Sequence, residues 1–307
     1  MKKRKLGSSD LFVSEISLGC MNIGTEMSQA EKIVETALDN GINYLDTADL
    51  YYQGLNEELI GEIVKRKRND IILATKAGNR FEQGKDGWSW DPSKKHIMTA
   101  VKDSLRRLQT DYIDLYQLHG GTIEDNIDET IDAFEQLKKE GVIRYYGISS
   151  IRPNVIREYV KRSSIVSIMM QYSLLDRRPE EWFAFLEENE VSVVARGPVA
   201  KGLLTNRKLE TMSPTIKEKG YLNYSYEELV SFRARVEQEV LQGRPLQAFA
   251  LQYCLHSPVV ASVVAGASSA EQVQENIQSV ESTTITTDEI AWLKQATKQD
   301  VYEQHRQ

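Results

Sequence analysis

The sequence predicts an α/β protein, a (β/α)8 TIM barrel with an N-terminal β-hairpin and long loops after some strands. From Ile16 onward, short β-branched or aromatic runs alternate eight times with amphipathic stretches of helical period, which is the pattern of parallel βαβ units. The 307 residues, 41% of them hydrophobic, suffice for the core of one such barrel. Since no linker rich in Pro, Ser or Gly divides the chain, residues 1–307 are expected to form a single domain.

The expected strands are short and apolar. In chain order they are Ile16–Leu18, Asn43–Asp46, Ile71–Thr75, Ile113–Leu118, Tyr145–Ser149, Ile168–Gln171, Ser192–Arg196 and Val263–Ala265. Before them, Lys5–Leu6 and Phe12–Val13 flank the turn-forming sequence GSSD. We expect these two segments to pair as a hairpin that closes the bottom of the barrel.

Two stretches show the helical pattern most clearly. In residues 29–41 the apolar side chains fall on one face, and Gly41 follows as a stop signal. Residues 127–141 repeat this arrangement, with acidic residues first and with Lys138 and Lys139 near the end, as the helix dipole favours. Both stretches are therefore expected to be helices that cover the barrel.

Two segments are longer than ordinary barrel loops. Ala77–Pro92 contains Trp88 and Trp90, and Lys201–Pro245 is expected to contain a helix near Glu227–Leu241. Barrel enzymes place substrate recognition in the long loops that follow strands. These segments are therefore candidates for that role.

Composition excludes several classes of protein. The net charge of −7 comes from acidic residues scattered along the chain, which argues against a nucleic-acid surface. The basic start lacks the apolar stretch of a signal peptide, and no run approaches the ~20 apolar residues of a membrane span, so a cytoplasmic protein is expected. Cys20 and Cys254 are far apart in the sequence and lack neighbours at metal-ligand spacing, which indicates neither a disulfide nor a zinc site.

Four reactive side chains stand at or just beyond the ends of the second, third and fourth strands. They are Asp46, Tyr51, Lys76 and His119, in the contexts NYLDTADLYYQG, IILATKAG and YIDLYQLHGG. Barrel enzymes build their sites at this end of the strands. Because the three strands are neighbours in the predicted barrel, the four side chains are expected to meet there.

Together these four groups suit carbonyl reduction, which needs a hydride donor and an acid that protonates the oxygen. A tyrosine serves as that acid if its pKa, near ~10, is lowered. Lys76 favours the tyrosinate, Asp46 can hold the ammonium group, and His119 can orient the carbonyl oxygen. Taken singly, Asp46 could cap a turn and Tyr51 could be a half-buried aromatic residue, so the interpretation depends on their coincidence.

The motifs DTADLY, ATK and LH resemble the Asp, Tyr, Lys and His tetrad of the aldo-keto reductases. The resemblance continues through KKEGVIRYYGISS, QYSLL, GPVAKGLLT and GASSAEQVQEN, and it covers nearly the whole chain. The family spacing D-T-A-x-x-Y selects Tyr51 rather than Tyr52 as the acid. The resemblance implies reduction of aldehydes or ketones to alcohols with NADPH, while NADH is the alternative cofactor.

The cofactor would have to bind without the usual fingerprints, because the chain has neither a G-x-x-x-x-G-K-[ST] loop nor a G-x-G-x-x-G motif. Barrels commonly bind phosphates in the loops after their last two strands. By resemblance, the cofactor-binding residues fall in three groups along the cofactor. They are Met21, Ser149, Ser150 and Gln171 around the nicotinamide, Gly197, Pro198, Val199 and Gly202 along the pyrophosphate, and Arg207, Ser268, Gln272, Glu275 and Asn276 around the adenosine end.

The sequence departs from the family pattern at three places. Ser150 stands where many members carry Asn, and Arg196 stands where an aromatic or small residue often contacts the nicotinamide. Residues 268–270 are neutral, although members that bind NADP usually place a cation near the 2′-phosphate. Arg207 or Lys201 could supply that cation.

The pocket wall and the function class each keep alternatives. Cys20, Met21, Trp88 and Trp90 could form an apolar wall beside the nicotinamide, or the two tryptophans could simply anchor a loop. Besides a reductase acting on a small-molecule carbonyl compound, the sequence allows a cofactor-sensing channel subunit without turnover. It also allows a metal-assisted hydrolase or a Schiff-base aldolase that uses Lys76 or His119. No feature selects an oligomeric state.

Overall fold

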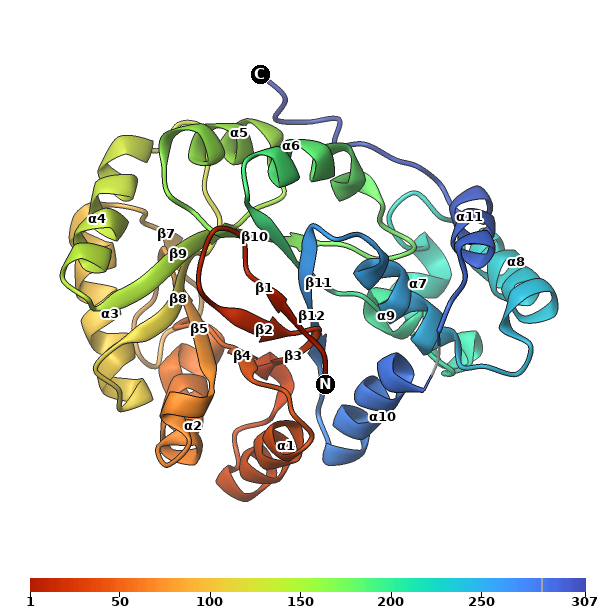
Figure 1. The fold of residues 1–307 in the computed structure, drawn as a ribbon, viewed down its shortest axis with the longest axis horizontal. Helices are drawn as coiled ribbons and strands as arrows, with labels where there is room; N and C mark the ends of the chain where they lie inside the picture. The colour runs from red at the N-terminus through yellow and green to blue at the C-terminus, as the bar shows by residue number, and fades with distance from the viewer. Residues whose placement is uncertain (283) are drawn as a thin grey trace.

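The computed structural model describes residues 1–282 and 284–307, and within them eight parallel strands close into a barrel (Figure 1). These strands are β3 (Ile16–Gly19), β4 (Tyr44–Asp46), β5 (Ile72–Ala77), β8 (Ile113–Leu118), β9 (Ile143–Ser149), β10 (Ser167–Gln171), β11 (Ser192–Arg196) and β12 (Val260–Gly266). Pairing of β12 with β3 completes the closure. The predicted (β/α)8 fold is confirmed.

Helices surround the barrel on its outer side. They are α1 (Met27–Asp39), α2 (Leu55–Val64), α3 (Lys94–Leu108), α4 (Ile127–Lys139), α5 (Pro153–Arg162), α6 (Phe183–Glu188), α9 (Leu246–His256) and α10 (Ala270–Glu281), while α7 (Pro214–Lys219), α8 (Tyr226–Val236) and α11 (Thr287–Ala296) are additions to that ring. Short helical turns are η1 (Cys20–Asn22), η2 (Tyr51–Gly54), η3 (Arg68–Asp70), η4 (Arg178–Trp182), η5 (Ala200–Gly202), η6 (Leu209–Thr211) and the π-turn η7 (Glu237–Leu241).

Helix α4 illustrates how the sequence determines these elements. The side chain of Asn126 caps its first turn by accepting a hydrogen bond from the Glu129 amide at 3.3 Å. Its apolar stripe, which includes Ile131 and Phe134, is buried. Lys138 lies in the last turn, where its charge complements the helix dipole.

The bottom of the barrel is covered by a hairpin of β1 (Lys3–Lys5) and β2 (Phe12–Ser14), which Figure 1 shows across the barrel opening. The expected pairing of Lys5–Leu6 with Phe12–Val13 is displaced, because Lys5 already pairs with Phe12. Leu6 lies between β1 and the turn and is fully buried. Burial of this leucine explains why the apolar pattern extended one residue beyond the strand.

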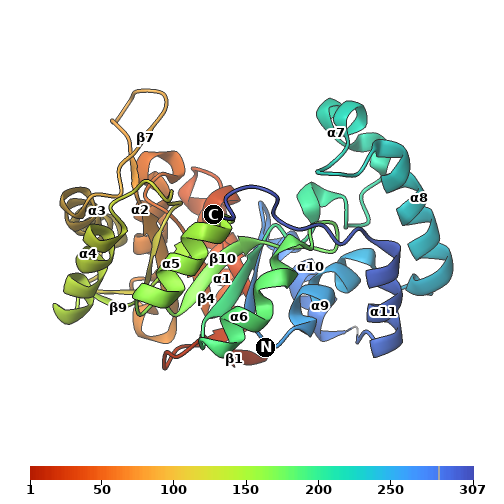
Figure 2. The same ribbon diagram turned by 90° about the horizontal axis from the view of Figure 1, so that it is seen from above.

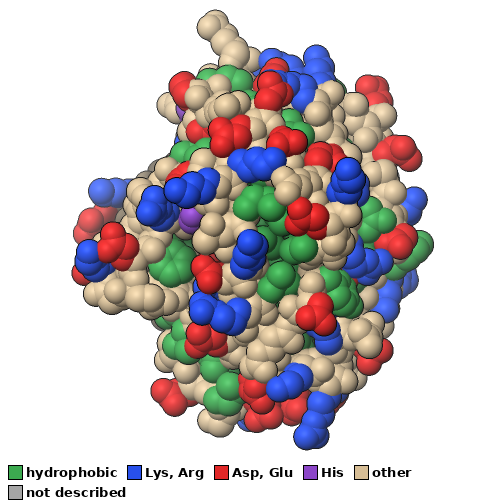
Figure 3. Space-filling model, turned by 90° about the vertical axis from the view of Figure 1, so that its left-hand side faces the viewer, with side chains coloured by type: hydrophobic (Ala, Val, Ile, Leu, Met, Phe, Trp, Pro, Cys, Tyr) green, Lys and Arg blue, Asp and Glu red, His purple; other side chains and the backbone are tan. Residues whose placement is uncertain are grey.

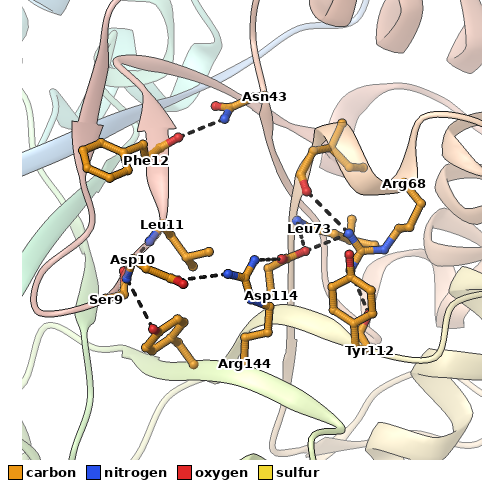
Figure 4. A network of polar contacts seen from close by, with 12 residues as sticks. Ser9, Asp10, Leu11, Phe12, Asn43, Arg68, Leu73, Tyr112, Asp114 and Arg144 are labelled. Atoms are coloured by element: carbon orange, nitrogen blue, oxygen red, sulfur yellow. Dashed lines mark hydrogen bonds and ion pairs between the residues drawn. The ribbon is translucent and has the colours of Figure 1, made fainter.

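A buried carboxylate ties the bottom of the barrel together (Figure 4). Asp114, on β8, is 1% exposed and forms ion pairs with Arg68 and Arg144, each at 2.8 Å. It also accepts a hydrogen bond from the Leu73 amide at 3.1 Å. Arg144 reaches onward to Asp10 in the hairpin turn at 2.9 Å, so the network joins the hairpin to the strands.

Both long loops contain short elements of their own. Residues 77–92 contain the two-stranded sheet of β6 (Asn79–Arg80) and β7 (Ser89–Trp90), which projects above the mouth in Figure 2. Residues 201–245 contain α7, α8 and η7. The helix expected near Glu227–Leu241 corresponds to α8 and η7, which run together from Tyr226 to Leu241.

The described part of the chain contains no helix that is both long and apolar enough to cross a membrane. On the face shown in Figure 3, acidic and basic side chains intermingle without a large area of one sign. Cys20 and Cys254 are buried free thiols.

Candidate active site

The structure brings the four predicted catalytic side chains to one mouth of the barrel. Asp46 ends β4, Lys76 lies in the adjacent β5, and His119 directly follows β8. The ammonium nitrogen of Lys76 lies 2.6 Å from Asp46 Oδ2 and 5.3 Å from the centre of the Tyr51 ring. The rings of Tyr51 and His119 meet edge to face, with centroids 6.1 Å apart.

The ion pair between Lys76 and Asp46 is buried, with exposed fractions of 1% and 3%. Lys76 also donates to the Thr47 carbonyl at 2.8 Å, and Gln117 donates to Asp46 Oδ1 at 3.3 Å. Burial raises the pKa of Asp46 against the opposing effect of the Lys76 charge. Burial alone would lower the pKa of Lys76, but the attraction of Asp46 and Tyr51 outweighs it and raises that pKa, so Lys76 keeps its proton.

Tyr51 differs from the sequence-based expectation. Its pKa is raised above the ordinary value because burial disfavours the phenolate, although the nearby Lys76 charge acts in the lowering direction. The expectation of a net lowering is therefore wrong for the protein without ligands. At neutral pH Tyr51 carries its proton, as a donor to a developing alkoxide requires.

His119 is neutral in this environment. Burial, followed by the charges of Lys76 and Arg196, lowers its pKa to about 3. Its buried Nδ1 has no hydrogen-bond partner among the described residues. A neutral imidazole with an unused nitrogen can donate to or accept from a ligand atom at the mouth.

The turn that presents Tyr51 has an unusual backbone. Tyr52 and Gln53 have φ values of 49° and 53°, and Gly54 follows at 93°. Such left-handed conformations cost energy in residues with a side chain and persist where surrounding contacts hold them. The η2 turn is therefore expected to be held in this conformation by contacts with other segments of the chain.

Contacts that the sequence analysis missed brace this turn. Glu57, fully buried at the start of α2, accepts from Thr75 at 2.6 Å and from Arg107 at 2.7 Å. Asn56, also fully buried, donates to the Cys20 carbonyl at 2.8 Å. The spacing of Asn56 and Glu57 could have indicated these contacts, because the two residues precede the apolar face of α2 at positions that helical geometry turns inward.

Part of the predicted cofactor set lines a cavity of about 670 Å³ beside β11 and β12. The members of that set are Val199, Gly202, Arg207, Gln272, Glu275 and Asn276. Ser268 lies next to it, and its amide donates to Gln272 at 2.8 Å. This cavity gathers the side chains expected at the adenosine end.

A second cavity, of about 520 Å³, lies at the mouth. It is lined by Ser149, Ser150 and Arg196 from the sequence analysis, together with Gly120, the neighbour of His119. Its other lining residues are Ile151, Arg152, Arg178, Asn223 and residues 301–305.

The remaining predicted cofactor residues line neither cavity. Gln171 donates to Asp176 at 2.9 Å and accepts from Arg196 at 3.2 Å, so its amide is already engaged. Gly197 and Pro198 form the turn after β11. Met21 is 49% exposed after β3.

The two tryptophans of the long loop behave differently. Trp90 donates to Asp125 at 3.0 Å, and its ring is packed so closely that a Cβ added at Gly120 would lie 3.1 Å from it. Trp88 is 59% exposed. Trp90 therefore combines an anchoring contact with a position beside the mouth, while Trp88 forms no hydrogen bond of this kind with the residues that the structure describes.

These features fit a nicotinamide dinucleotide. The cavity beside β11 and β12 offers amide groups and the Arg207 cation for a phosphate and an adenosine, and Gly202 leaves room for close approach. Ser149 and Ser150 add hydroxyl groups at the mouth, near the tetrad. Both cavities lie at the carboxyl ends of the strands, where barrels bind ligands.

Comparison with known proteins identifies the family, because the model of the aldo/keto reductase family matches residues 15–298. The chain belongs to the aldo/keto reductase family. The Bacillus subtilis oxidoreductase YqkF is 62% identical over 306 residues, covering 100% of both chains. The holo form of aldo-keto reductase AKR11C1 from Bacillus halodurans is 63% identical, covers 100% of both chains and superposes with a TM-score of 0.94.

A more distant relative, the NADH-specific methylglyoxal reductase of Escherichia coli, is 30% identical and covers 90% of this chain and 93% of its own. The resemblance stated from the sequence is confirmed. This chain is an oxidoreductase of a family that uses nicotinamide cofactors and acts on small molecules.

Proposed function

We propose that this protein reduces the carbonyl group of an aldehyde or ketone to an alcohol, with NADPH as the reductant. The observation that carries the proposal is the buried Lys76–Asp46 ion pair beside the Tyr51 ring, which itself meets the His119 ring edge to face. The proposal treats residues 1–307 as one domain. It places the reaction in the cytoplasm, where free thiols stay reduced.

The cofactor would lie along the two cavities. Ser149 and Ser150 would bind the nicotinamide carboxamide, with Gln171 and Met21 alongside. Residues 197–202 would follow the pyrophosphate, and the side chains of the larger cavity would surround the adenosine end. When bound, the cofactor supplies the hydride.

Tyr51 acts as the general acid in this proposal. Its phenol proton passes to the carbonyl oxygen, so the substrate gains one hydride and one proton and becomes an alcohol. The Lys76 charge stabilises the resulting phenolate, and Asp46 holds the ammonium group beside it. His119, being neutral, donates a hydrogen bond that orients the oxygen, and solvent then returns a proton to Tyr51.

The preference for NADPH is supported by Arg207, which lines the larger cavity and could pair with a 2′-phosphate. NADH is the alternative. The neutral stretch 268–270 and the 30% identity to an NADH-specific methylglyoxal reductase both favour it.

A binding titration followed by a turnover assay tests the proposal. Purified protein is titrated with NADPH and separately with NADH while protein fluorescence is measured, and oxidation of each cofactor is then followed with an aromatic aldehyde. We expect binding and turnover, with tighter binding of NADPH. Binding without turnover would support the cofactor sensor, and an absence of binding would contradict the assignment of both cavities.

The aldolase and hydrolase alternatives have their own test. Borohydride trapping with a carbonyl compound would label Lys76 if it formed a Schiff base, and metal analysis would detect a stoichiometric ion. The buried Asp46 partner of Lys76 favours a protonated amine, which is not nucleophilic. We therefore expect neither a label nor a stoichiometric metal.

A further inference from the structure

The smaller cavity, at the mouth, is rich in cations. Arg152, Arg178 and Arg196 line it, whereas Glu303 is the acidic residue in its lining. This is unexpected in a chain with a net charge of −7. Since Gly120 and Ser149 line the same cavity, these arginines lie close to the proposed reaction centre.

Arg152 has no carboxylate partner within ion-pair distance in residues 1–282 and 284–307. Its guanidinium group donates to the Gly121 carbonyl, and the planar group has five N–H donors in total. Arg152 lies at the start of α5, where the Asn154 amide already donates to the His305 carbonyl at 2.7 Å. The Asn154 amide at the start of α5 is therefore already used, whereas the Arg152 guanidinium group retains N–H donors for a ligand.

The other two arginines differ in their partners. Arg178 is held by Asp176 through two contacts of 2.7 and 2.8 Å, so its charge is largely balanced. Arg196 donates to the Gln171 side chain at 3.2 Å and has no acidic partner within the described ranges. Within the described residues, Arg152 and Arg196 therefore face the cavity without an ion-pair partner, and Glu303 is the acidic side chain that lines it with them.

The C-terminal segment forms one wall of this cavity through residues 301–305. Figure 2 shows it crossing from α11 to α5, and it is pinned where Glu181 accepts from the Tyr302 amide at 3.0 Å and pairs with Arg306 at 2.6 Å. Tyr302 also packs against Arg178, 5.0 Å from ring centre to guanidinium carbon. These contacts hold the C-terminal segment in place as a wall of the cavity.

The positive charge is separate from the expected cofactor-phosphate site. The larger cavity, which holds the residues assigned to the adenosine end, shares no lining residue with the smaller one. The loops after β11 and β12 supply the phosphate contacts that barrels use. Arg152 follows β9, two strands away from β11 in the barrel order, so it lies apart from the residues assigned to the pyrophosphate and the adenosine end.

We propose that the smaller cavity is a subsite for an anionic group of the substrate, so that the enzyme prefers carbonyl compounds carrying a carboxylate or a phosphate. Arg152 is its principal contact, because a guanidinium group binds either anion through two parallel hydrogen bonds. Arg196 adds attraction at longer range. This inference rests on the proposed function and names its substrate class.

Matched substrates test the inference. The anion 4-oxobutanoate and its methyl ester have the same aldehyde and the same carbon chain but differ by one charge. Glyceraldehyde 3-phosphate and glyceraldehyde form the corresponding pair for phosphate. The kcat/KM ratio of anionic to neutral substrate is measured in each pair for the parent, for Arg152→Gln and for Arg162→Gln, which removes a charge from the same helix outside the cavity.

We expect the parent to favour at least one anion about tenfold, and Arg152→Gln to remove about tenfold from that ratio, which is the value of one charge-assisted hydrogen bond. Arg162→Gln should keep the parent ratio, and added salt should reduce it. Whichever pair shows the larger ratio identifies the anion. In calorimetric titration, the product 4-hydroxybutanoate or glycerol 3-phosphate should bind Arg152→Gln more weakly than the parent.

Two results would overturn the inference. Equal kcat/KM values for both members of each pair would exclude an anion subsite while leaving carbonyl reduction intact. An equal loss for anionic and neutral substrates in Arg152→Gln would show that Arg152 only supports the fold. Absence of turnover with all four compounds, and with an aromatic aldehyde, would instead remove the proposed function and this inference together.

Discussion

Each end of the barrel contains a buried carboxylate, and the two differ in their ion-pair and hydrogen-bond partners. At the bottom, Asp114 has two arginines and a backbone amide around it. At the mouth, Asp46 has Lys76 and a weaker contact from Gln117. The two carboxylates are similarly buried, so the difference lies in what surrounds their partners.

The partners at the bottom have only structural contacts, whereas Lys76 at the mouth also lies against Tyr51. Within the described residues, the mouth retains unpaired buried atoms such as His119 Nδ1 and Gln117 Oε1, while Asp114 is fully engaged. Barrels in general keep catalysis at the carboxyl ends of the strands and stability at the other end. The two carboxylates therefore provide a direct test of that division.

The largest effect is expected from Tyr51→Phe, which removes the phenol proton and keeps the ring. Turnover should fall about 10²–10⁴-fold, because general acid catalysis contributes that much, and cofactor binding should change little. Steady-state kinetics and fluorescence titration measure the two quantities. The matched control is Tyr52→Phe, at a side chain that is 50% exposed; parent activity in Tyr51→Phe would identify a different acid.

The next largest effect is expected from Asp114→Ala at the bottom. It leaves Arg68 and Arg144 without their buried partner, and the free energy of unfolding should fall by about 3 kcal/mol, the low end for a broken buried pair because Arg144 is 40% exposed. Urea unfolding measures this change. The folded fraction should retain the parent kcat, since the site is at the other end of the barrel.

Asp10→Ala is the control for that variant, because Asp10 pairs with the same Arg144 but is 68% exposed. Its effect should stay below about 1 kcal/mol. Similar losses of unfolding free energy in the two variants would show that burial of Asp114 adds nothing to stability. A lower kcat in Asp114→Ala would show that the bottom of the barrel influences the active site at the mouth.

A third effect, smaller for each pH unit, concerns pH and His119. The pKa of His119 is about 3 in the folded protein and near ~6.5 when unfolded, so the unfolded chain binds the extra proton. Stability should therefore decrease as pH falls from about 6.5 toward 3, by at most about 1.4 kcal/mol per pH unit for this group. Unfolding midpoints of the parent and of His119→Asn, measured across that range, give the dependence of stability on pH for each protein. The same dependence in both would show that folding does not lower the pKa of His119.

The smallest effect is expected from Arg207→Gln at the open end of the larger cavity. NADPH should bind about fivefold more weakly or less, because an exposed ion pair contributes little, and NADH binding should stay at the parent value. Lys208→Gln removes a neighbouring charge outside the cavity lining and serves as the control. A parallel loss for both cofactors would place Arg207 against a group that they share.

The fold was predictable because alternation of apolar segments is a local property. The eight strands were located with ends shifted by a few residues; β5 continues to Ala77 rather than stopping at Thr75, so Lys76 lies within a strand. The meeting of Asp46, Lys76, Tyr51 and His119 followed from strand order alone. Contacts between distant segments did not follow, such as that of Glu57 with Arg107, fifty residues away.

The electrostatics of the site were only partly predictable. The sign of the influence of Lys76 on Tyr51 was correct, but the extent of burial, which decides the net pKa, depends on packing that the sequence does not display. The cation-rich cavity was missed for a similar reason. Arg152 and the residues from Val301 onward meet only because the C-terminal segment crosses the mouth.

The position of the chain ends has a practical consequence. The carbonyl of Gln307 accepts from Asn154 at 2.8 Å, and Figure 2 shows the C-terminus beside α5 and the N-terminus near the hairpin at the opposite end. A purification tag or surface tether fused after Gln307 would compete with that contact beside the mouth of the barrel. Fusion at Met1 leaves the mouth of the barrel clear and requires only the release of the ion pair between the terminal amine and Glu281.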